Sequence, residues 1–100
     1  MHVSGTGPVG ADEADPETQT RNTLEIIRGV LERAGARMED VVRTRIYLTH
    51  VEDWQAVGRV HGEFFGTIRP AATMVVVAKL LTPSWRVEIE ADAIIASLEK

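Results

Sequence analysis

The most regular hydrophobic pattern lies near the C-terminal end of the chain, between Ile68 and Ala93. From Ser84 onward polar and apolar residues alternate strictly. The apolar row consists of Trp85, Val87, Ile89, Ala91 and Ala93, and the polar row of Ser84, Arg86, Glu88, Glu90 and Asp92. Because successive side chains of a strand point to opposite faces, the pattern predicts a strand with one buried face. A site would lie on its polar face.

A second strand is expected from Ala71 to Leu80, just before the first. Its positions Met74 to Ala78 are all apolar, which is typical of a strand covered on both sides. The connection from Leu81 to Ser84 contains Pro83, a residue type that a central strand excludes. We therefore expect the two strands to form a hairpin around which the rest of the fold grows.

Two helices are expected before this hairpin. Asp15, Pro16 and Glu17 form a helix start with an N-cap, a first-position proline and an acidic first turn. The helix is expected to end at Gly35. Its apolar stripe consists of Thr20, Leu24, Ile27, Leu31 and Ala34. Thr49 and Glu52 match a capping box for the second helix. Its stripe consists of Trp54, Val57, His61 and Phe64, and it ends at Gly66.

A further strand is expected from Val41 to Thr49. Val42, Thr44, Ile46 and Leu48 share one face, and Arg43, Arg45, Tyr47 and Thr49 share the other. The two arginines could bind an anionic ligand or pair with carboxylates such as Glu88 and Glu90. Cross-strand charge pairs are common in sheets, so pairing is the favoured interpretation.

The ends of the chain are less regular. His2 to Ser4 is compatible with a short strand, and Gly5 to Pro8 predicts a turn with positive φ rather than a phosphate-binding loop. Ile94 to Lys100 fits either a strand continuation or a short helix. The order β, α, β, α, β, β predicts an α+β fold with both helices on one face of a mixed sheet. If the other face is partly apolar, self-association is expected.

Composition limits the functional classes. One hundred residues indicate a single domain, residues 1–100. The chain has no cysteine, which excludes thiolate chemistry and fits a reducing cytoplasm. Its net charge of -4 argues against nucleic-acid partners, and it contains no apolar run near the ~20 residues of a membrane span. We find no spacing typical of a metal site, and His61 alone is more typical of a hydrogen-bonded core histidine than of a catalytic one.

Several short motifs together resemble the Rid family (YjgF-like, reactive intermediate deaminases). They are the segment that begins with Gly35-Ala36 and ends with Asp40–Thr44, and the shorter motifs Tyr47-Leu48-Thr49, Glu63-Phe64-Phe65, Arg69-Pro70-Ala71 and Val87–Ala91. The resemblance runs from about Val3 to Ala93. It implies a fold similar to Bacillus chorismate mutase and a homotrimer with ligand clefts between subunits. It also implies hydrolysis of enamines and imines such as 2-aminoacrylate without a metal or cofactor. In comparison with the family, the first strand of this chain is expected to be truncated.

The family motifs carry over to some positions and not to others. Typical active members have Arg in the motif Pro-Ala-Arg-Ser/Thr, where it holds the substrate carboxylate, but here Ala72 occupies that position. Met74 stands where Cys is common, Gly58 where deaminating members have Asn, and His61 where a Tyr is expected. This sequence keeps Ser4 and Gly5 of the family's turn. It also keeps Glu88, which the resemblance implies is the residue that orients water. By itself, Glu88 would be interpreted as solvated or paired with Arg.

Three functions remain open. The first is a Rid-like hydrolase of altered specificity, in which Glu88 orients water, His61 acts as acid or base, and backbone amides near Ser4 and Thr73 bind substrate. Weak or absent 2-aminoacrylate deaminase activity is expected, because loss of a charged contact commonly costs about 1.5–3 kcal/mol. The second is a non-catalytic, metabolite-binding trimer. The third and least favoured is a ribonuclease, because the chain lacks a basic stripe.

Overall fold

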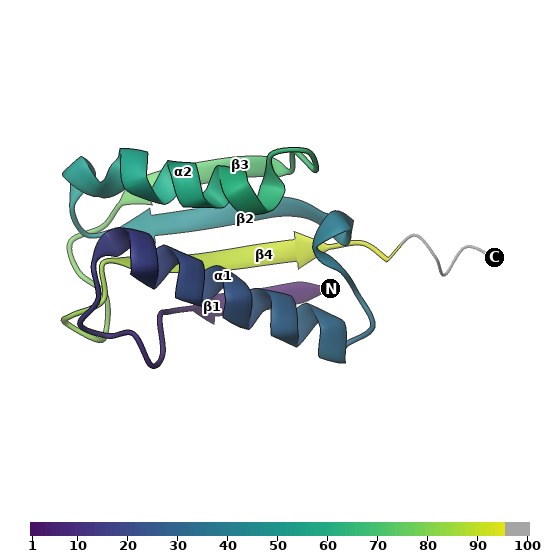
Figure 1. Cartoon of the computed structure of the whole chain (residues 1–100), viewed down its shortest axis with the longest axis horizontal. Helices are drawn as coiled ribbons and strands as arrows, with labels where there is room; N and C mark the ends of the chain where they lie inside the picture. Colours follow the sequence, from purple (N-terminus) through teal and green to yellow (C-terminus); the bar gives the residue numbers. More distant parts are fainter. Residues whose placement is uncertain (96–100) are drawn as a thin grey trace.

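The computed structural model describes residues 1–95 as a four-stranded mixed sheet with two helices on one face (Figure 1). The elements in order are β1 (His2–Thr6), α1 (Pro16–Arg33), η1 (Met38–Asp40), β2 (Val41–Leu48), η2 (Val51–Asp53), α2 (Trp54–Phe65), β3 (Ala71–Val76) and β4 (Val87–Ala93). The α+β class and the predicted element order are confirmed. Ile94 and Ile95 belong to no helix or strand, and the rest of the terminal stretch lies outside the described residues.

The predicted hairpin is wrong. The strand order is β1-β4-β2-β3, so β2 lies between the two strands that were expected to pair. β3 runs parallel to β2, and β4 runs antiparallel to β2 and β1. The reason is that α2 connects β2 to β3, and such a crossover returns the chain parallel to the strand that it left. The segment after β3 then carries the chain to the other side of β2.

Strand β4 has the buried face that its alternation predicts. Val87, Ile89, Ala91 and Ala93 are each at most 1% exposed. The strand begins at Val87 rather than Trp85, which lies in the preceding turn and is partly exposed. Because β4 pairs with both β1 and β2, it is a central strand, and its polar row faces the side of the sheet opposite the helices, here called the open face.

Strand β3 forms an exposed apolar edge, contrary to the expectation of cover on both sides. It ends at Val76 rather than Leu80. Val75 is 41% and Val76 50% exposed, and only Met74 packs against the core. The continuous apolar run predicted a strand that is covered on both faces. In residues 1–95, however, no element covers this run.

Helix α1 begins and ends as its sequence predicts. The side chain of Asp15 accepts a hydrogen bond of 2.7 Å from the amide of Thr18, which makes it the N-cap. Thr20, Leu24, Ile27 and Leu31 are all fully buried against the sheet, whereas Ala34 is exposed after the last turn. Gly35 has φ of 87°, the left-handed conformation that favours glycine at this position.

The start of α2 differs from the prediction. The capping box of Thr49 and Glu52 does not form, because η2 intervenes and the Thr49 hydroxyl lies 2.8 Å from Nδ1 of His50. Trp54, expected on the buried stripe, is 54% exposed. The buried residues of the helix are Val57, Val60 and Phe65.

A register irregularity changes the face of one β2 residue. The pairing of β2 with β4 shifts between Val41 and Arg43. Val41 is consequently buried and Val42 is 44% exposed, the reverse of what strict alternation predicts. From Thr44 to Leu48 the alternation holds, with Arg45 and Tyr47 on the open face.

A fully buried glutamine on α1 joins three separate segments. The amide nitrogen of Gln19 donates to the carbonyls of Asp12, Ala14 and Ser84 at 3.0–3.1 Å. Its carbonyl oxygen accepts 2.7 Å from the amide of Arg86. The side chain therefore fixes α1 and the loop before it to the entrance of β4.

Replacing Gln19 with Met is expected to lower the free energy of unfolding by about 2–4 kcal/mol. Each buried backbone group left without a partner costs about 1–3 kcal/mol, partly offset by relaxation and water entry. The measurement is urea unfolding followed by circular dichroism. The matched control is Gln55→Met on the exposed side of α2, which should change stability by less than about 0.5 kcal/mol. Equal effects of the two changes would contradict the role of Gln19.

Candidate functional site

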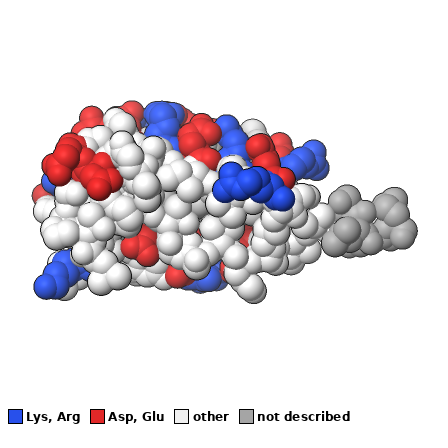
Figure 2. Space-filling model, turned by 90° about the horizontal axis from the view of Figure 1, so that it is seen from below, with Lys and Arg blue, Asp and Glu red and all other residues white. Residues whose placement is uncertain are grey.

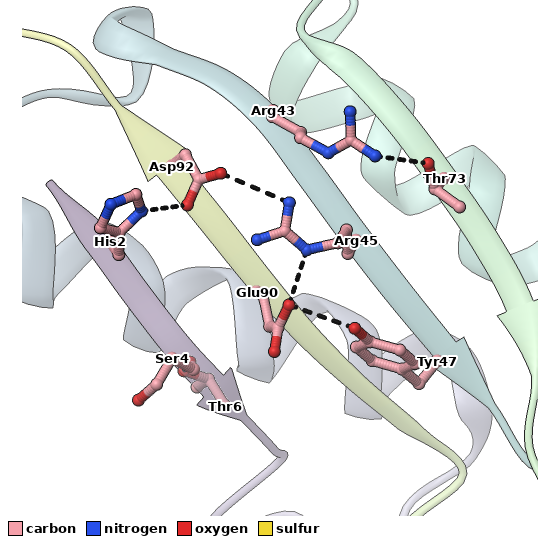
Figure 3. A network of polar contacts seen from close by, with 9 residues as sticks. All are labelled: His2, Ser4, Thr6, Arg43, Arg45, Tyr47, Thr73, Glu90 and Asp92. Carbon is pink, nitrogen blue, oxygen red and sulfur yellow. Dashed lines mark hydrogen bonds and ion pairs between the residues drawn. The ribbon is translucent and has the colours of Figure 1, made fainter.

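A network of charged and polar side chains lies on the open face of the sheet (Figure 3). Arg45 Nε donates to Glu90 Oε1 at 2.8 Å, and its Nη1 lies 3.4 Å from Asp92 Oδ2. The Tyr47 hydroxyl donates to the same Glu90 oxygen at 3.1 Å. His2 Nδ1 lies 2.7 Å from Asp92 Oδ1. The network therefore crosses from β1 through β4 to β2.

The network has a clear electrostatic effect on its members. The hydrogen bond from His2, supported by the charge of Arg45, lowers the pKa of the Asp92 carboxyl. The hydrogen bond to Glu90 raises the pKa of Arg45. The interpretation of Arg45 as a partner of carboxylates is confirmed, with Glu90 and Asp92 as the partners.

Glu88 lies on the same open face, close to the backbone of Gly5. A Cβ atom on Gly5 would overlap the Glu88 carboxylate, so the glutamate side chain would have to shift to admit any other residue there. Gly7 makes room for the Trp85 ring in the same way. The turn with positive φ expected for Gly5 to Pro8 is wrong, because positive φ values occur at Gly10, Gly35 and Arg69 instead. Ser4, beside Gly5 in β1, is exposed on the open face (Figure 3).

His61 lies on the opposite, helix-covered side of the sheet. Its Nε2 is 2.9 Å from the hydroxyl of Thr44, which is fully buried. Burial lowers the pKa of His61, which favours the neutral ring at pH 7. Within one chain, therefore, the sheet separates His61 from Glu88.

The predicted binding residues of β3 divide between the two faces. Ala72 is in register with Thr44 and Met74 with Ile46, which places both on the side of His61. Thr73 points to the open face, where Arg43 Nη2 donates to its hydroxyl at 3.2 Å (Figure 3). Ala72 is exposed and offers only a methyl group.

The predicted site residues thus form two separate groups. Ser4, Gly5 and Glu88 lie on the open face at the β1 side of the sheet, and His61, Ala72, Thr73 and Met74 lie at or near β3, the opposite edge. Three surface hollows of the described chain are lined by residues 10–14, by residues of α1 and η1, and by residues 79–83. None of these three includes a predicted site residue.

A partly buried ion pair between Arg86 and Asp53 was not predicted from the sequence. Arg86 Nε and Nη2 donate to the two carboxylate oxygens of Asp53 at 2.9 and 3.0 Å. Asp53 is 6% exposed, and the hydrogen bond to it raises the pKa of Arg86. The sequence placed Arg86 in the polar row of a strand, but the arginine precedes β4 and its guanidinium is committed to Asp53.

Two further findings concern cofactors and membranes. In residues 1–95, no group of three or more histidine or acidic side chains is arranged to hold a metal ion. Neither helix of the described chain combines the length and apolar character needed to cross a membrane.

The family model described as Endoribonuclease L-PSP matches residues 1–95, and the chain belongs to this family, which includes the YjgF, RutC and Rid proteins. A RutC family protein of Pyrococcus abyssi is 37% identical over 85 residues, covering 80% of this chain and 67% of that protein. The fold is that of the YjgF group, similar to chorismate mutase, as the resemblance implied.

Two solved structures show the likeness in three dimensions. Rv2704 of Mycobacterium tuberculosis, a member of the YjgF/YER057c/UK114 family, is 48% identical with a TM-score of 0.88. The match covers 94% of this chain and 77% of that one. TdcF of E. coli, solved with bound serine, is 28% identical with a TM-score of 0.88, covering 95% of this chain and 80% of TdcF.

Protonation of His61 is expected to destabilise the protein as pH falls. The folded pKa is below the unfolded value of about 6.5, so the unfolded chain binds more protons and stability decreases from about pH 6.5 downward. Urea unfolding at pH 7.5 and 5.5 should show a smaller loss for His61→Gln than for the wild type. His50→Gln, on an exposed loop residue, is the control. An unchanged pH dependence in His61→Gln would contradict the assignment.

Proposed function

We propose that the chain forms a homotrimer that binds a small metabolite in clefts between its subunits. The observation that carries this proposal is the division of the predicted site residues between two sheet edges and two sheet faces. A cleft can combine Ser4, Gly5 and Glu88 of one copy with Ala72 and Met74 of the next. The number of subunits, three, is what the resemblance to the Rid family implies.

The exposed apolar edge supports assembly. Val75 and Val76, at the end of β3, are 41% and 50% exposed. Val42 is 44% exposed at the opposite end of the β2–β3 pair, near Ala71. A strand edge that no described element pairs with, and that carries exposed apolar side chains, is a ready site for association with another chain. A head-to-tail contact, in which the β3 edge of one copy meets the open face of another, would bury this edge and join the two groups of site residues.

The proposed chemistry is imine or enamine hydrolysis of altered specificity, with the cytoplasm as its compartment. Glu88 would orient the attacking water, the backbone amides near Ser4 and Thr73 would hold the substrate, and His61 would act as acid or base. Ala72 cannot provide the two hydrogen bonds with which an arginine grips a carboxylate. Activity on 2-aminoacrylate is therefore proposed to be weak or absent. The likeness to serine-bound TdcF supports a small-molecule ligand.

A non-catalytic binding protein is the second candidate, and the position of His61 favours it. Its ring is hydrogen-bonded to the buried Thr44 on the covered side of the sheet. A histidine committed in this way fits a structural role better than proton transfer. The cleft would then retain binding without its acid or base.

A ribonuclease is the least favoured function, although the family model carries that name. Nucleic-acid binding depends on neutralising phosphates with Lys and Arg. The chain has a net charge of -4. On the face shown in Figure 2, basic side chains lie among acidic ones, mostly on the helix side, and broad uncharged surface lies below them.

The protein is expected to be a trimer in solution. Light scattering coupled to size-exclusion chromatography should give three times the chain mass of 11.0 kDa. A monomeric mass at micromolar concentration would remove the proposed cleft and both leading functions with it.

The protein should accelerate ammonia release from 2-aminoacrylate, generated enzymatically from serine, little or not at all over the spontaneous hydrolysis of this enamine. The expected reason is the missing carboxylate anchor, since loss of about 1.5–3 kcal/mol weakens substrate binding roughly 10–100-fold. Ala72→Arg should raise the rate if the remaining groups are in place, and Ala72→Gln serves as a control of similar polarity without charge. Robust wild-type activity would show that Ala72 does not limit the reaction.

A further inference from the structure

In the middle of the open face the charged groups pair with one another, whereas one charged group at each side has no ion-pair partner among the described residues. Arg45 pairs with Glu90 and Asp92, and Asp92 also contacts His2. Among residues 1–95, no ion pair within 4.0 Å involves Arg43 or Glu88. Within residues 1–95, the face thus carries one cation and one anion without an ion-pair partner.

These two groups belong to opposite parts of the sheet. Arg43 lies on β2 and reaches toward β3, where the Thr73 hydroxyl holds its guanidinium (Figure 3). Glu88 lies on β4 and reaches toward β1, where its carboxylate rests over Gly5. Because β4 is antiparallel to β2 and Glu88 is in register with Tyr47, the two groups also lie near opposite strand ends. Arg43 is hydrogen-bonded to Thr73 and Glu88 lies against Gly5, so the two groups do not meet within one chain.

We propose that Arg43 of one copy faces Glu88 of the neighbouring copy and completes the inter-subunit site. The inference rests on the proposed function, because it needs the head-to-tail contact between the β3 edge and the open face. That contact brings the Arg43 and Thr73 pair of one copy to the Glu88 and Gly5 pair of the next. Opposite charges placed at complementary positions fix the register of an interface.

The two charges also define a class of ligand. A guanidinium binds a carboxylate with paired hydrogen bonds, and a carboxylate binds an ammonium group. A cleft with Arg43 on one wall and Glu88 on the other therefore fits a small zwitterion, an α-amino acid, better than a plain anion or cation. Arg43 supplies the positive charge that position 72 lacks, from the other face of the sheet.

Charge reversal tests the contact without any ligand. Arg43→Glu and Glu88→Arg should each weaken the trimer at least about tenfold, measured as its dissociation on dilution. The double variant should recover most of the loss, and circular dichroism confirms that each variant is folded. Arg59→Glu is the control, because Arg59 pairs with Glu17 between the helices, away from the open face.

The outcomes separate this inference from the proposed function. A monomeric wild type overturns both. A trimeric wild type whose single reversals have no effect, or whose double variant shows no recovery, overturns the Arg43–Glu88 contact and leaves the trimer standing. Should Glu88→Arg fail to fold, a double-mutant cycle of Arg43→Gln and Glu88→Gln replaces it, and additive effects overturn the contact.

Calorimetry with three related compounds tests the ligand class. L-Serine should bind at least about tenfold more tightly than L-serinamide, which lacks the carboxylate, and than L-glycerate, which lacks the ammonium group. Arg43→Gln should remove the preference over serinamide, and Glu88→Gln the preference over glycerate. Absent or equal binding of the three compounds by the wild type overturns the zwitterion assignment.

Discussion

The structure depends on the side-chain amide of Gln19. This group is fully buried on α1, and a buried amide must find partners for its hydrogens and its oxygen. It finds them on the loop before the helix and on both sides of Trp85, at Ser84 and Arg86. The position of α1 along the sheet and the entry point of β4 are therefore set together. Glu88, two residues further on, acquires its place from the same hydrogen bonds.

Close approach of β1 to β4 is the second constraint, and it follows from the first. Once Gln19 places the start of β4, Trp85 and Glu88 project toward the first strand. The Trp85 ring and the Glu88 carboxylate lie against Gly7 and Gly5, and a Cβ atom at either position would overlap them. The glycines are present because of this contact between strands rather than because of positive φ. Ser4 and Gly5 consequently lie beside Glu88. This group of candidate site residues is therefore brought together within one chain.

The local features of this fold could be predicted from the sequence, and the non-local ones could not. The N-cap at Asp15, the stripe of α1 and the buried row of β4 follow from periodicities that need no knowledge of neighbours. The order of the strands depends on the crossover through α2, so adjacency along the chain wrongly suggested a hairpin. Gln19 was missed because a polar residue within a helix carries no periodic signal of burial. The apolar run of β3 was recognised, but the chain alone does not bury it.

The division of the site has a chemical consequence. In the family motif an arginine at position 72 would project from the face that also carries Met74 and approaches His61. Arg43 projects from the open face, on the same side as Thr73 and Glu88. In the proposed cleft, a ligand held by Arg43 would therefore turn its carboxylate toward a different wall from a ligand held at position 72. The reacting carbon of a substrate would shift relative to Glu88, which is the geometric reason for the altered specificity that we propose.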